Sequence, residues 1–327
     1  MITAAIPDTA AVTSWVGDAV LAPSMHNAQP WRFRWQPDTG VLLLDMDPSR
    51  AMPRTDPAGR GLHVGCGAAL FDLRVAAAHS GWTARVRLLP DAAGTRVLAA
   101  LTFVRPAEEP DLDLLHPAIR RRRTNREPFT SEPVAPELRD GLCAAARAEG
   151  AHLSFPGTWH LETVLELIAS AEAAEALSPA VREEIARWTA SGDAKGRTDG
   201  IPASAFGPRR YDGRAPVRDF AIGSRPRERS SAIFERLPSL AVLETHGDTP
   251  ADWLMAGQAM QRVLLQATLD GLATTLNSQA VEWPALRWAL RDPLSSEGHP
   301  QMVIRLGYGP EVPPTPRRPV SEVLEVT

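Results

Sequence analysis

The residues with the clearest chemical potential lie in one short loop near the N-terminus. Residues 22–31 read Ala-Pro-Ser-Met-His-Asn-Ala-Gln-Pro-Trp, and they place Ser24, His26, Asn27 and Gln29 within six positions. A proline near each end restricts the backbone of this loop. Neutral hydrogen-bonding side chains on a stiff loop suit a planar polar heterocycle better than a metal ion. The same residue types also cap ordinary turns before strands, and the pattern alone leaves both interpretations open.

A second candidate is the basic stretch of residues 120–126, which holds five arginines around Thr124 and Asn125. Guanidinium groups beside a hydroxyl match the geometry of a phosphate. A solvated basic turn is the alternative, because the chain contains a single lysine and is biased toward arginine. Nucleic-acid binding is disfavoured, since one cluster makes few phosphate contacts and no aromatic residues interleave with it. A smaller pair, Arg317 and Arg318, follows the last long strand pattern.

Other catalytic and metal-binding signatures are absent from the sequence. It has no glycine-rich dinucleotide fingerprint, no Walker loop and no nucleophile elbow. Its eight histidines show no metal-ligand spacing, and two cysteines cannot form a disulfide framework or a cysteine-rich metal site. Cys66 lies in an apolar helical pattern and is interpreted as a small core residue.

The composition limits the possible functions. The chain has 327 residues, with 44% hydrophobic and 23% charged residues and a net charge of -4. A sizeable core can therefore form, and the acidic balance argues against a dedicated nucleic-acid binder. No apolar run reaches the roughly 18 residues of a membrane span, and no basic segment precedes an apolar stretch at the N-terminus. We expect a cytoplasmic protein that acts on a small molecule, with no nucleic-acid or membrane partner.

Helix and strand patterns alternate along the chain and must position these residues. Hydrophobic periodicity and capping signals predict helices over 8–21, 57–80, 112–121, 136–149, 159–176, 179–190, 250–270 and 283–291. Strands are predicted over 31–36, 41–46, 83–89, 96–104, 151–155, 240–245, 275–277 and 302–308, with an extended tail over 310–319. Residues 191–237 are rich in Gly, Pro, Arg and Ser without a period, which is typical of a functional lid or a disordered segment.

Two of the predicted helices align with each other at an offset of 190 residues. Gly67 matches Gly257, and Leu73 matches Val263. Each helix ends at a glycine and is followed by a strand that contains threonine. This pattern indicates an internal repeat, although any two Ala-rich amphipathic helices align comparably well, and the sequence alone leaves both explanations open.

Taken together, these motifs resemble the FMN-dependent nitroreductase family. Its members carry a loop of the form Ala-Pro-Ser-Ser-x-Asn-x-Gln-Pro-Trp, which residues 22–31 match except at Met25. They also carry an Arg-Arg-Ser-x-Arg-x-Phe segment, which residues 122–129 match with Thr124 for Ser and one added residue before Phe129. A Gly-Tyr strand end followed by prolines and basic residues completes the match over 306–319.

The order of the motifs is reversed relative to ordinary members, since here the loop precedes the Arg segment. Ordinary members are homodimers whose flavin lies between subunits, with the loop from one subunit and the Arg segment from the other. The resemblance therefore implies two fused subunits in one chain, as in the Acg-type branch. It implies an α+β fold of two related halves, residues 1–110 and 111–327, each with a mostly antiparallel sheet flanked by helices, and a lid over 191–237.

The same resemblance assigns the candidate site residues. It implies that FMN phosphate is held by Arg122, Arg123, Thr124 and Arg126 together with Arg317 and Arg318. It implies that Pro23, Ser24, Met25 and Asn27 contact the flavin ring and ribityl chain, and that backbone N–H groups near Ser278 and Gln279 face flavin N5 and O4. No catalytic side chain is expected, because the flavin itself carries the hydride.

The function implied is an FMN-dependent oxidoreductase that uses NAD(P)H to reduce a nitro-aromatic, a quinone or another small conjugated acceptor. Two alternatives stay open. One is a flavin-sequestering protein whose lid limits turnover, and the other is a biosynthetic flavin dehydrogenase. One loop and one Arg segment per chain predict one FMN per chain and a monomer, because the two halves replace a dimer.

Overall fold

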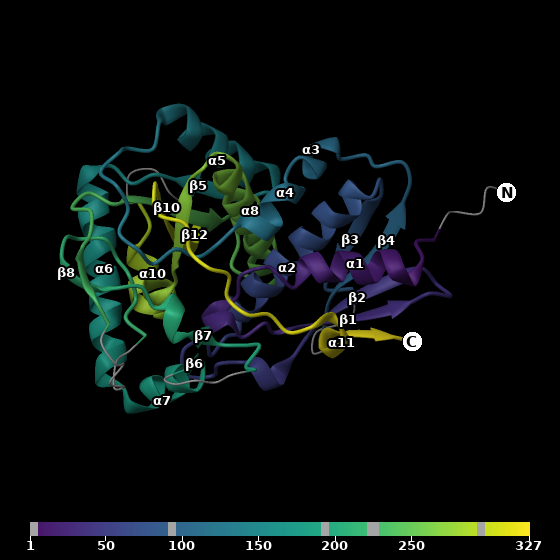
Figure 1. Ribbon diagram of the computed structural model, residues 1–327, viewed down its shortest axis with the longest axis horizontal. Coiled ribbons are helices and arrows are strands. Elements are labelled where there is room, and N and C mark those ends of the chain that lie inside the picture. Colours follow the sequence, from purple (N-terminus) through teal and green to yellow (C-terminus); the bar gives the residue numbers. More distant parts are fainter. Residues whose placement is uncertain (1–5, 91–95, 191–195, 221–228, 293–297) are drawn as a thin grey trace.

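Two sheets, each flanked by helices, meet at a central pair of long helices in the computed structural model (Figure 1). The structure describes residues 6–90, 96–190, 196–220, 229–292 and 298–327. The central helices are α2 (Arg60–His79) and α8 (Pro250–Leu269). The α+β class expected from the sequence is confirmed.

The first sheet has the strand order β13-β1-β2-β4-β3. Its hairpin of β1 (Trp31–Gln36) and β2 (Val41–Met46) spans the two strands that the sequence predicts. Along β1, Phe33 and Trp35 are buried whereas Arg34 pairs with Asp45 at the outer face, which is the alternation of a sheet with one covered face. The next two strands are β3 (Thr83–Leu88) and β4 (Val97–Val104).

The second sheet is antiparallel, with the order β11-β12-β10-β5. It comprises β5 (His152–Ser154), β10 (Ser239–Thr245), β11 (Ala273–Asn277) and β12 (His299–Gly307). Helices cover both faces of β10. Leu240 and Val242 pack in a cluster with α6 (Thr158–Leu177), and Ala241 and Leu243 pack in the cluster that includes α8. This double coverage explains why β10 reads as a continuous apolar run.

The two sheets share one strand order. β1-β2-β4-β3 in the first corresponds to β5-β10-β12-β11 in the second. α2 connects β2 to β3, and α8 connects β10 to β11. Each of these helices is followed by a glycine with positive φ, Gly81 at 77° and Gly271 at 76°. The matching topology agrees with the repeat pattern found in the sequence.

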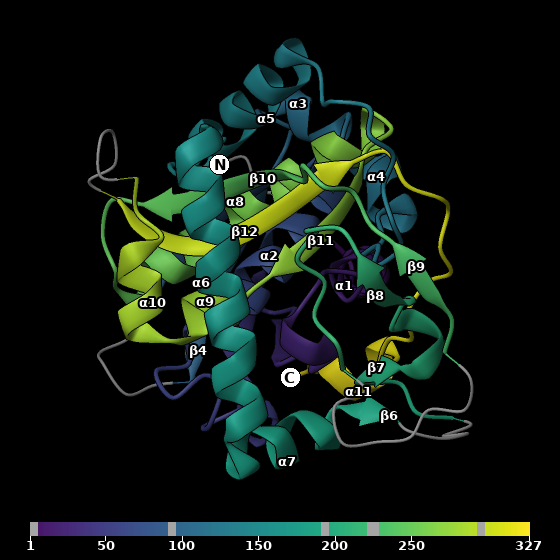
Figure 2. The ribbon, with the colours of Figure 1, turned by 90° about the vertical axis from the view of Figure 1, so that its left-hand side faces the viewer.

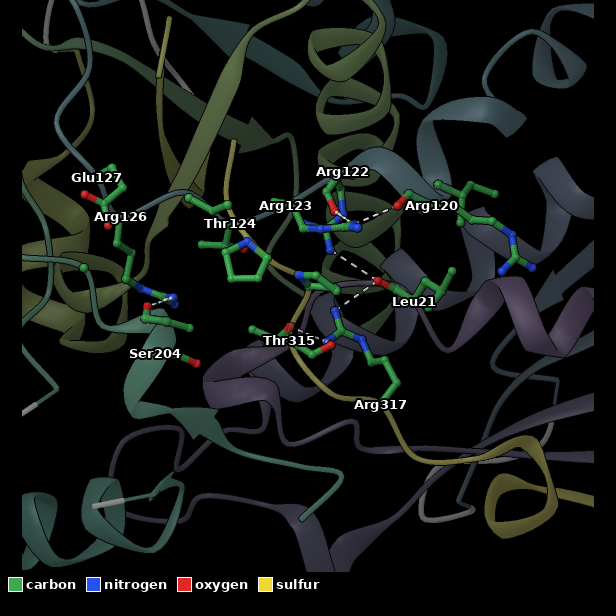
Figure 3. Close-up of a pocket in the computed structure, with 16 residues that line it drawn as sticks. Leu21, Arg120, Arg122, Arg123, Thr124, Arg126, Glu127, Ser204, Thr315 and Arg317 are labelled. Atoms are coloured by element: carbon green, nitrogen blue, oxygen red, sulfur yellow. Dashed lines mark hydrogen bonds between the residues drawn. The ribbon is translucent and has the colours of Figure 1, made fainter. Parts of the chain in front are cut away.

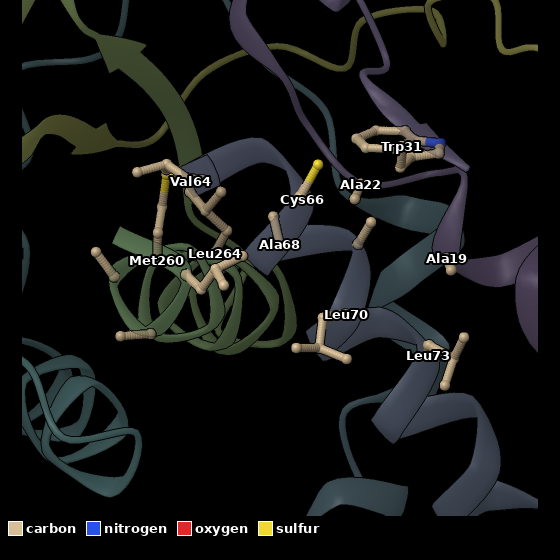
Figure 4. Packing of buried hydrophobic residues seen from close by; sticks show 14 of the residues in the cluster. Ala19, Ala22, Trp31, Val64, Cys66, Ala68, Leu70, Leu73, Met260 and Leu264 are labelled. Carbon is tan, nitrogen blue, oxygen red and sulfur yellow. The ribbon is translucent and has the colours of Figure 1, made fainter. Parts of the chain in front are cut away.

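The aligned glycines of α2 and α8 contact each other where the helices cross. A Cβ atom on Gly67 would lie 2.2 Å from the Leu254 carbonyl oxygen, and one on Gly257 would lie 2.1 Å from that of Val64. Neither position has room for a side chain, so glycine sets how closely the two halves approach. Around the crossing, Val64 and Ala68 of α2 face Met260 and Leu264 of α8 (Figure 4).

The C-terminal tail joins the two halves a second time. After β12 the chain runs extended over 310–319 and crosses to the first half (Figure 1). There α11 (Val320–Val323) leads into β13 (Leu324–Val326), which pairs in parallel with β1. The sequence does not predict β13, because three residues carry too little periodicity. β13 therefore adds a strand from the predicted second half, residues 111–327, to the sheet of the first half.

Several helix boundaries differ from the sequence expectation. The single helix expected over 112–121 is two short ones, α3 (Pro110–Asp113) and α4 (His116–Arg121), because Pro117 lies in the first turn of a new helix, where proline is tolerated. The helix expected from residue 57 is α2 and begins only at Arg60, and the Asp56 carboxylate accepts hydrogen bonds from the N–H groups of Gly61 and Leu62. The remaining helices are α1 (Thr9–Ala19), α5 (Pro136–Ala148), α7 (Pro179–Arg187), α9 (Gln279–Glu282) and α10 (Pro284–Ala289).

The segment expected to form a lid, residues 191–237, is described over 196–220 and 229–237, and the rest of it lies outside the described residues. We call these two described parts the lid. β6 (Thr189–Ala190) pairs with β7 (Ile201–Pro202), and β8 (Arg209–Asp212) pairs with β9 (Ser231–Ile233), both in parallel. Figure 2 shows β7, β8 and β9 grouped on one side of the second half, with α6 crossing the front.

Helix α2 is long and apolar enough to meet a simple test for a membrane span, with a mean hydropathy of 1.2 over 18 residues. However, 89% of that window is buried inside the protein. The helix therefore forms the core between the two sheets.

Candidate functional site

The loop over residues 22–30 adopts an unusual backbone conformation. His26, Asn27 and Gln29 all have positive φ, at 48°, 56° and 54°. Residues other than glycine seldom adopt such angles, and they persist only where surrounding contacts hold them. Ser24 Oγ accepts a hydrogen bond from the Gln29 N–H at 2.9 Å, and the Gln29 side chain accepts one from the Arg318 N–H at 2.8 Å. Such strain is concentrated at functional sites, which favours the functional interpretation of this loop over an ordinary turn.

Two amides of the loop bind the lid and the tail. The Asn27 side chain donates to the carbonyl oxygens of Gly200 at 2.9 Å and Pro316 at 3.0 Å. The Gln29 side chain donates to the Thr198 carbonyl oxygen at 2.8 Å. Asn27 was expected to contact the flavin. It lines the candidate site, and both of its amide N–H groups have protein acceptors, so contact with a flavin through its remaining atoms stays a prediction.

Arg122, directly after α4, and Arg317, in the C-terminal tail, come together in the structure. Both donate to the carbonyl oxygen of Leu21, at 3.2 Å from Arg122 and 3.1 Å from Arg317, and Figure 3 shows the two guanidinium groups approaching it from two sides. Nε and Nη1 of Arg122 and Nε of Arg317 are buried without a hydrogen-bond partner among the described residues. These free donors are available to an anion.

Neither arginine forms a direct ion pair with a described residue, although the buried Asp72 is near enough to raise the pKa of both. Burial lowers the pKa of Arg122 to about 10. Burial and the neighbouring Arg122 lower the pKa of Arg317 to about 9. Both side chains therefore stay positively charged at neutral pH, in surroundings that disfavour the charge. A bound dianion would relieve this unfavourable electrostatic energy.

Residues 124–126 connect this basic cluster to β11 and to the lid. Asn125 donates its N–H to the Thr274 carbonyl oxygen at 2.8 Å, which fixes the segment against β11. Arg126 donates to the Ala205 carbonyl oxygen of the lid at 2.9 Å, and its guanidinium lies 5.0 Å from the Phe220 ring centroid. The Arg123 guanidinium instead bonds backbone carbonyl oxygens of its own helix end, including that of Arg120.

Two adjoining cavities lie here, at the junction of the two halves. We call the first the phosphate cavity. We call the second the ring cavity. Both are lined by Thr124, Arg126, Thr315 and Arg317, so they share one wall. The phosphate cavity is also lined by Arg122 and Arg123, and the ring cavity by Pro23, Ser24, Met25, Asn27 and Ser278.

The floor of the ring cavity is formed by the start of α2. Gly61 and Gly65 bring its backbone close to the loop. A Cβ atom on Gly61 would lie 2.5 Å from Met25 Cε, and one on Gly65 would lie 3.2 Å from Ser24 Cβ. Apolar side chains complete the walls, namely Val64, Met260, Leu276 and Met302. An apolar space beside hydrogen-bonding groups suits the ring system of a cofactor.

His26 lines the ring cavity without a protein partner. It is 5% exposed, and neither ring nitrogen has a hydrogen-bond partner among the described residues. Burial lowers the pKa of His26 well below its ordinary value, and the nearby Arg218 and Arg126 lower it further. The imidazole is therefore neutral. The Phe220 ring packs edge-on against it at 5.5 Å.

Two predicted site residues do not line either cavity. The Arg318 guanidinium bonds Glu322 at 3.3 Å and the Gln29 carbonyl oxygen, so it holds the loop and tail rather than facing the phosphate cavity. Adjacent residues in an extended tail point to opposite sides, which is why only Arg317 reaches the cavity. The Gln279 side chain is fully buried and donates to Glu172 at 3.3 Å. The expectation at this position concerned the backbone N–H groups near Ser278 and Gln279, and it stays a prediction.

The structure adds ring-cavity residues that the sequence analysis did not single out. Arg60 lies at the start of α2 and donates to the Gln301 carbonyl oxygen. Arg218 and Phe220 come from the lid. Their only sequence signal was membership of the 191–237 segment, and the arginine bias of the chain hides individual arginines. Thr315 could have been noted beside Arg317.

A groove on the other side of the molecule occupies the position related to the ring cavity by the repeat. Ala251 and Met255, the counterparts of Gly61 and Gly65, line it. The loop has no counterpart, because only residues 149–151 separate α5 from β5, and the Met255 side chain packs against Gly150 there. Arg74 in this groove is neutralised by Glu149 at 2.5 Å and Glu109 at 3.2 Å.

The residues at the two cavities fit FMN, the cofactor expected from the resemblance. The phosphate cavity presents buried guanidinium nitrogens without partners, and the ring cavity presents a glycine-lined floor and an unpartnered imidazole. Together they match a ligand with a dianionic head and a flat polar ring. The groove on the other side offers neither feature.

Comparisons with known proteins agree with this assignment. The Nitroreductase family profile matches residues 119–308. The chain is 32% identical to a Mycobacterium tuberculosis protein named "Putative NAD(P)H nitroreductase acg", over 98% of both chains. A second protein of that organism with the same type of name is 33% identical, over 98% of this chain and 92% of the relative.

Solved structures with some likeness include two nitroreductases. The Bacteroides fragilis nitroreductase with bound FMN gives a TM-score of 0.36 at 17% identity, covering 61% of this chain and 90% of that one. The FMN- and NADPH-dependent nitroreductase NfnB of Sphigopyxis gives 0.41 at 17% identity, covering 64% and 97%. Both TM-scores are below 0.5, so these structural likenesses carry no weight here, and the family is assigned from the sequence matches.

Proposed function

Since the chain belongs to the nitroreductase family, in its Acg-type branch, we propose that it is an FMN-dependent oxidoreductase that takes electrons from NAD(P)H and reduces a small conjugated acceptor. The observation that carries the proposal is the pair of adjoining cavities, one with buried arginines that have donors without a partner among the described residues and one lined by Gly61, Gly65 and apolar side chains. Nitro-aromatic and quinone-like compounds are the acceptor class we infer. A cytoplasmic location stays a prediction.

In this proposal the protein binds and positions the cofactor. Arg122 and Arg317 hold the phosphate by charge-assisted hydrogen bonds, with Thr124 and Arg126 at the shared wall. The loop residues Ser24 and Met25 and the start of α2 enclose the ring. When bound, FMN supplies the two-electron redox chemistry. The neutral His26 imidazole can donate or accept a hydrogen bond inside the ring cavity without adding a charge.

The lid serves to exclude water from the ring cavity. Arg218 and Phe220 form part of its wall, and Asn27 and Gln29 fasten the lid to the loop. A dry site strengthens each electrostatic contact with a bound ring. We infer that the chain arose by internal duplication and fusion of two nitroreductase-like halves, because the two sheets share one strand order and the aligned helices pack on each other.

A second candidate function is sequestration of the flavin. It is favoured by the burial of Arg218, which is 8% exposed and bridges two carboxylates, because such a lid does not open readily. Under this alternative the cofactor is bound tightly but is reduced slowly.

Anaerobic mixing of the purified flavoprotein with NADH, and separately with NADPH, distinguishes the two functions. We expect the flavin absorbance to bleach within seconds with at least one of them, because an oxidoreductase of this kind needs access of the nicotinamide to the ring. A flavin that stays oxidised for many minutes with both donors would contradict the oxidoreductase and favour sequestration. Reduction by dithionite is the control for a competent flavin.

A further inference from the structure

Arg218 of the lid inserts between two buried glutamates of the second half. Its guanidinium donates to Glu175 of α6 at 2.8 Å and to Glu282 of α9 at 3.1 Å. The side chains of Arg218, Glu175 and Glu282 are 8%, 4% and 3% exposed. Burial lowers the pKa of Arg218, but the two carboxylates raise it by more, so that the pKa lies above its ordinary value. Breaking one side of such a buried pair leaves uncompensated charge, so the arrangement strongly favours a closed lid.

The same contact reaches the wall of the ring cavity. Glu282 Oε1 accepts a hydrogen bond from Ser278 Oγ at 2.6 Å in addition to the bond from Arg218. Ser278 lines the ring cavity directly after β11, and Arg218 lines it from the lid. Two residues beyond Arg218, Phe220 packs against His26. One carboxylate therefore connects the lid to a side chain at the site.

A second ion pair between the lid and α6 involves a single glutamate and is exposed to solvent. Arg214 pairs with Glu162 through both carboxylate oxygens, but these side chains are 43% and 41% exposed. Exposed pairs of this kind contribute little to stability. Neither residue lines the phosphate cavity or the ring cavity. Arg214 is thus a matched control for Arg218, since it is an arginine of the same segment that bonds the same helix.

We propose that Arg218 is a positioning residue of the ring cavity. By bridging Glu175 and Glu282 it fastens the lid over the cavity, and through Glu282 it fixes the orientation of Ser278 at the cavity wall. This inference rests on the proposed FMN site and adds to it a specific latch that couples lid closure to the geometry around the ring.

The latch is tested by FMN release and by limited proteolysis. In the holoprotein we expect Arg218→Gln to speed FMN dissociation at least tenfold and Arg214→Gln to change it less than twofold. Arg218→Lys, which keeps the charge but lacks the fork that reaches both carboxylates, should fall between them and provides a folded variant if Arg218→Gln does not fold. Cleavage within the lid, residues 196–220 and 229–237, should rise in Arg218→Gln with or without FMN. Equal dissociation and cleavage in the Arg218→Gln and Arg214→Gln variants would overturn the latch.

The positioning role is tested by the midpoint potential of bound FMN, measured with a dye and a chemical reductant. Arg218→Gln and Ser278→Ala should shift the potential in the same direction, and the double variant should shift it no further than the larger single change. An unchanged potential in Arg218→Gln, or fully additive shifts, would refute the coupling through Glu282. None of these three measurements, FMN dissociation, proteolysis and midpoint potential, uses NAD(P)H. A wild-type protein that NAD(P)H does not reduce would therefore contradict the oxidoreductase while leaving the latch to be judged on these results.

Discussion

Replacing Arg122 with alanine is expected to weaken FMN binding by about 10- to 100-fold. Arg122 is buried beside the phosphate cavity, and its Nε and Nη1 have no partner among the described residues. Charge-assisted hydrogen bonds contribute roughly 1.5–3 kcal/mol each, and about 1.4 kcal/mol corresponds to a tenfold change in affinity. Titration of the flavin-free protein with FMN, followed by flavin fluorescence, measures the effect.

The control for this variant is Arg121→Ala, because Arg121 is the exposed neighbour in the same basic stretch and lines neither the phosphate nor the ring cavity. Its FMN affinity should stay within about twofold of the wild type, since surface charges act weakly at this distance. The flavin-free Arg122→Ala protein should unfold no more easily than the wild type, because a buried charge without an ion pair is itself unfavourable. Wild-type affinity in Arg122→Ala would contradict the phosphate assignment.

Adding one methyl group at Gly67 is expected to lower the free energy of unfolding by about 3 kcal/mol, at the upper end of the usual range for overpacked cores. The new Cβ would lie 2.2 Å from the Leu254 carbonyl oxygen, which is backbone and cannot rotate away. α2 and α8 would have to separate, and α2 carries the floor of the ring cavity. Urea denaturation at a fixed excess of FMN measures the change, and Gly257→Ala should behave alike.

Gly141→Ala is the matched control for the Gly67 variant. Gly141 also lies inside a helix, α5, but a Cβ there would meet nothing within 4 Å. Alanine is the better helix former, so this variant should gain about 0.5–1 kcal/mol. A Gly67→Ala protein as stable as Gly141→Ala would show that the close crossing does not hold the two halves together.

Local sequence patterns predict much of this fold. β1 and β2 appear over the predicted residues because their alternation and turn are encoded within a dozen positions. The helix predicted over 250–270 is present as α8, and it begins with a capping box in which the Asp252 carboxylate accepts from the Thr249 N–H. Local sequence patterns did not predict the elements whose formation depends on tertiary contacts. β13 exists because the tail crosses to the edge of β1, and nothing in its own three residues requires a strand.

The candidate site was predictable where a motif is contiguous and unpredictable where contacts are long-range. The loop and the Arg segment identify Ser24, Arg122 and Arg126 directly. Arg318 was grouped with Arg317 because the sequence does not say which of two adjacent side chains faces the cavity. Arg218 could not be found, since its role depends on two glutamates from helices that lie elsewhere in the sequence.

The difference between the two sides of the molecule explains why one flavin is expected. On one side, glycines, a strained loop and unpaired arginines line two adjoining cavities. On the other side, Met255 replaces Gly65 at the repeat-related position, three residues replace the loop, and Arg74 is paired with Glu149. Because this groove lacks both the phosphate contacts and the ring contacts, we expect it not to bind a second FMN.

The measurement that tests this account most directly is the ratio of FMN to protein, combined with the mass of the flavoprotein in solution. The flavin is released by heat from a known quantity of protein and quantified by absorbance, and light scattering gives the molar mass. The account predicts one FMN per chain in a monomer, because each chain contains both parts of a single site. Two FMN per chain, or an obligate dimer with the flavin bound between chains, would contradict it.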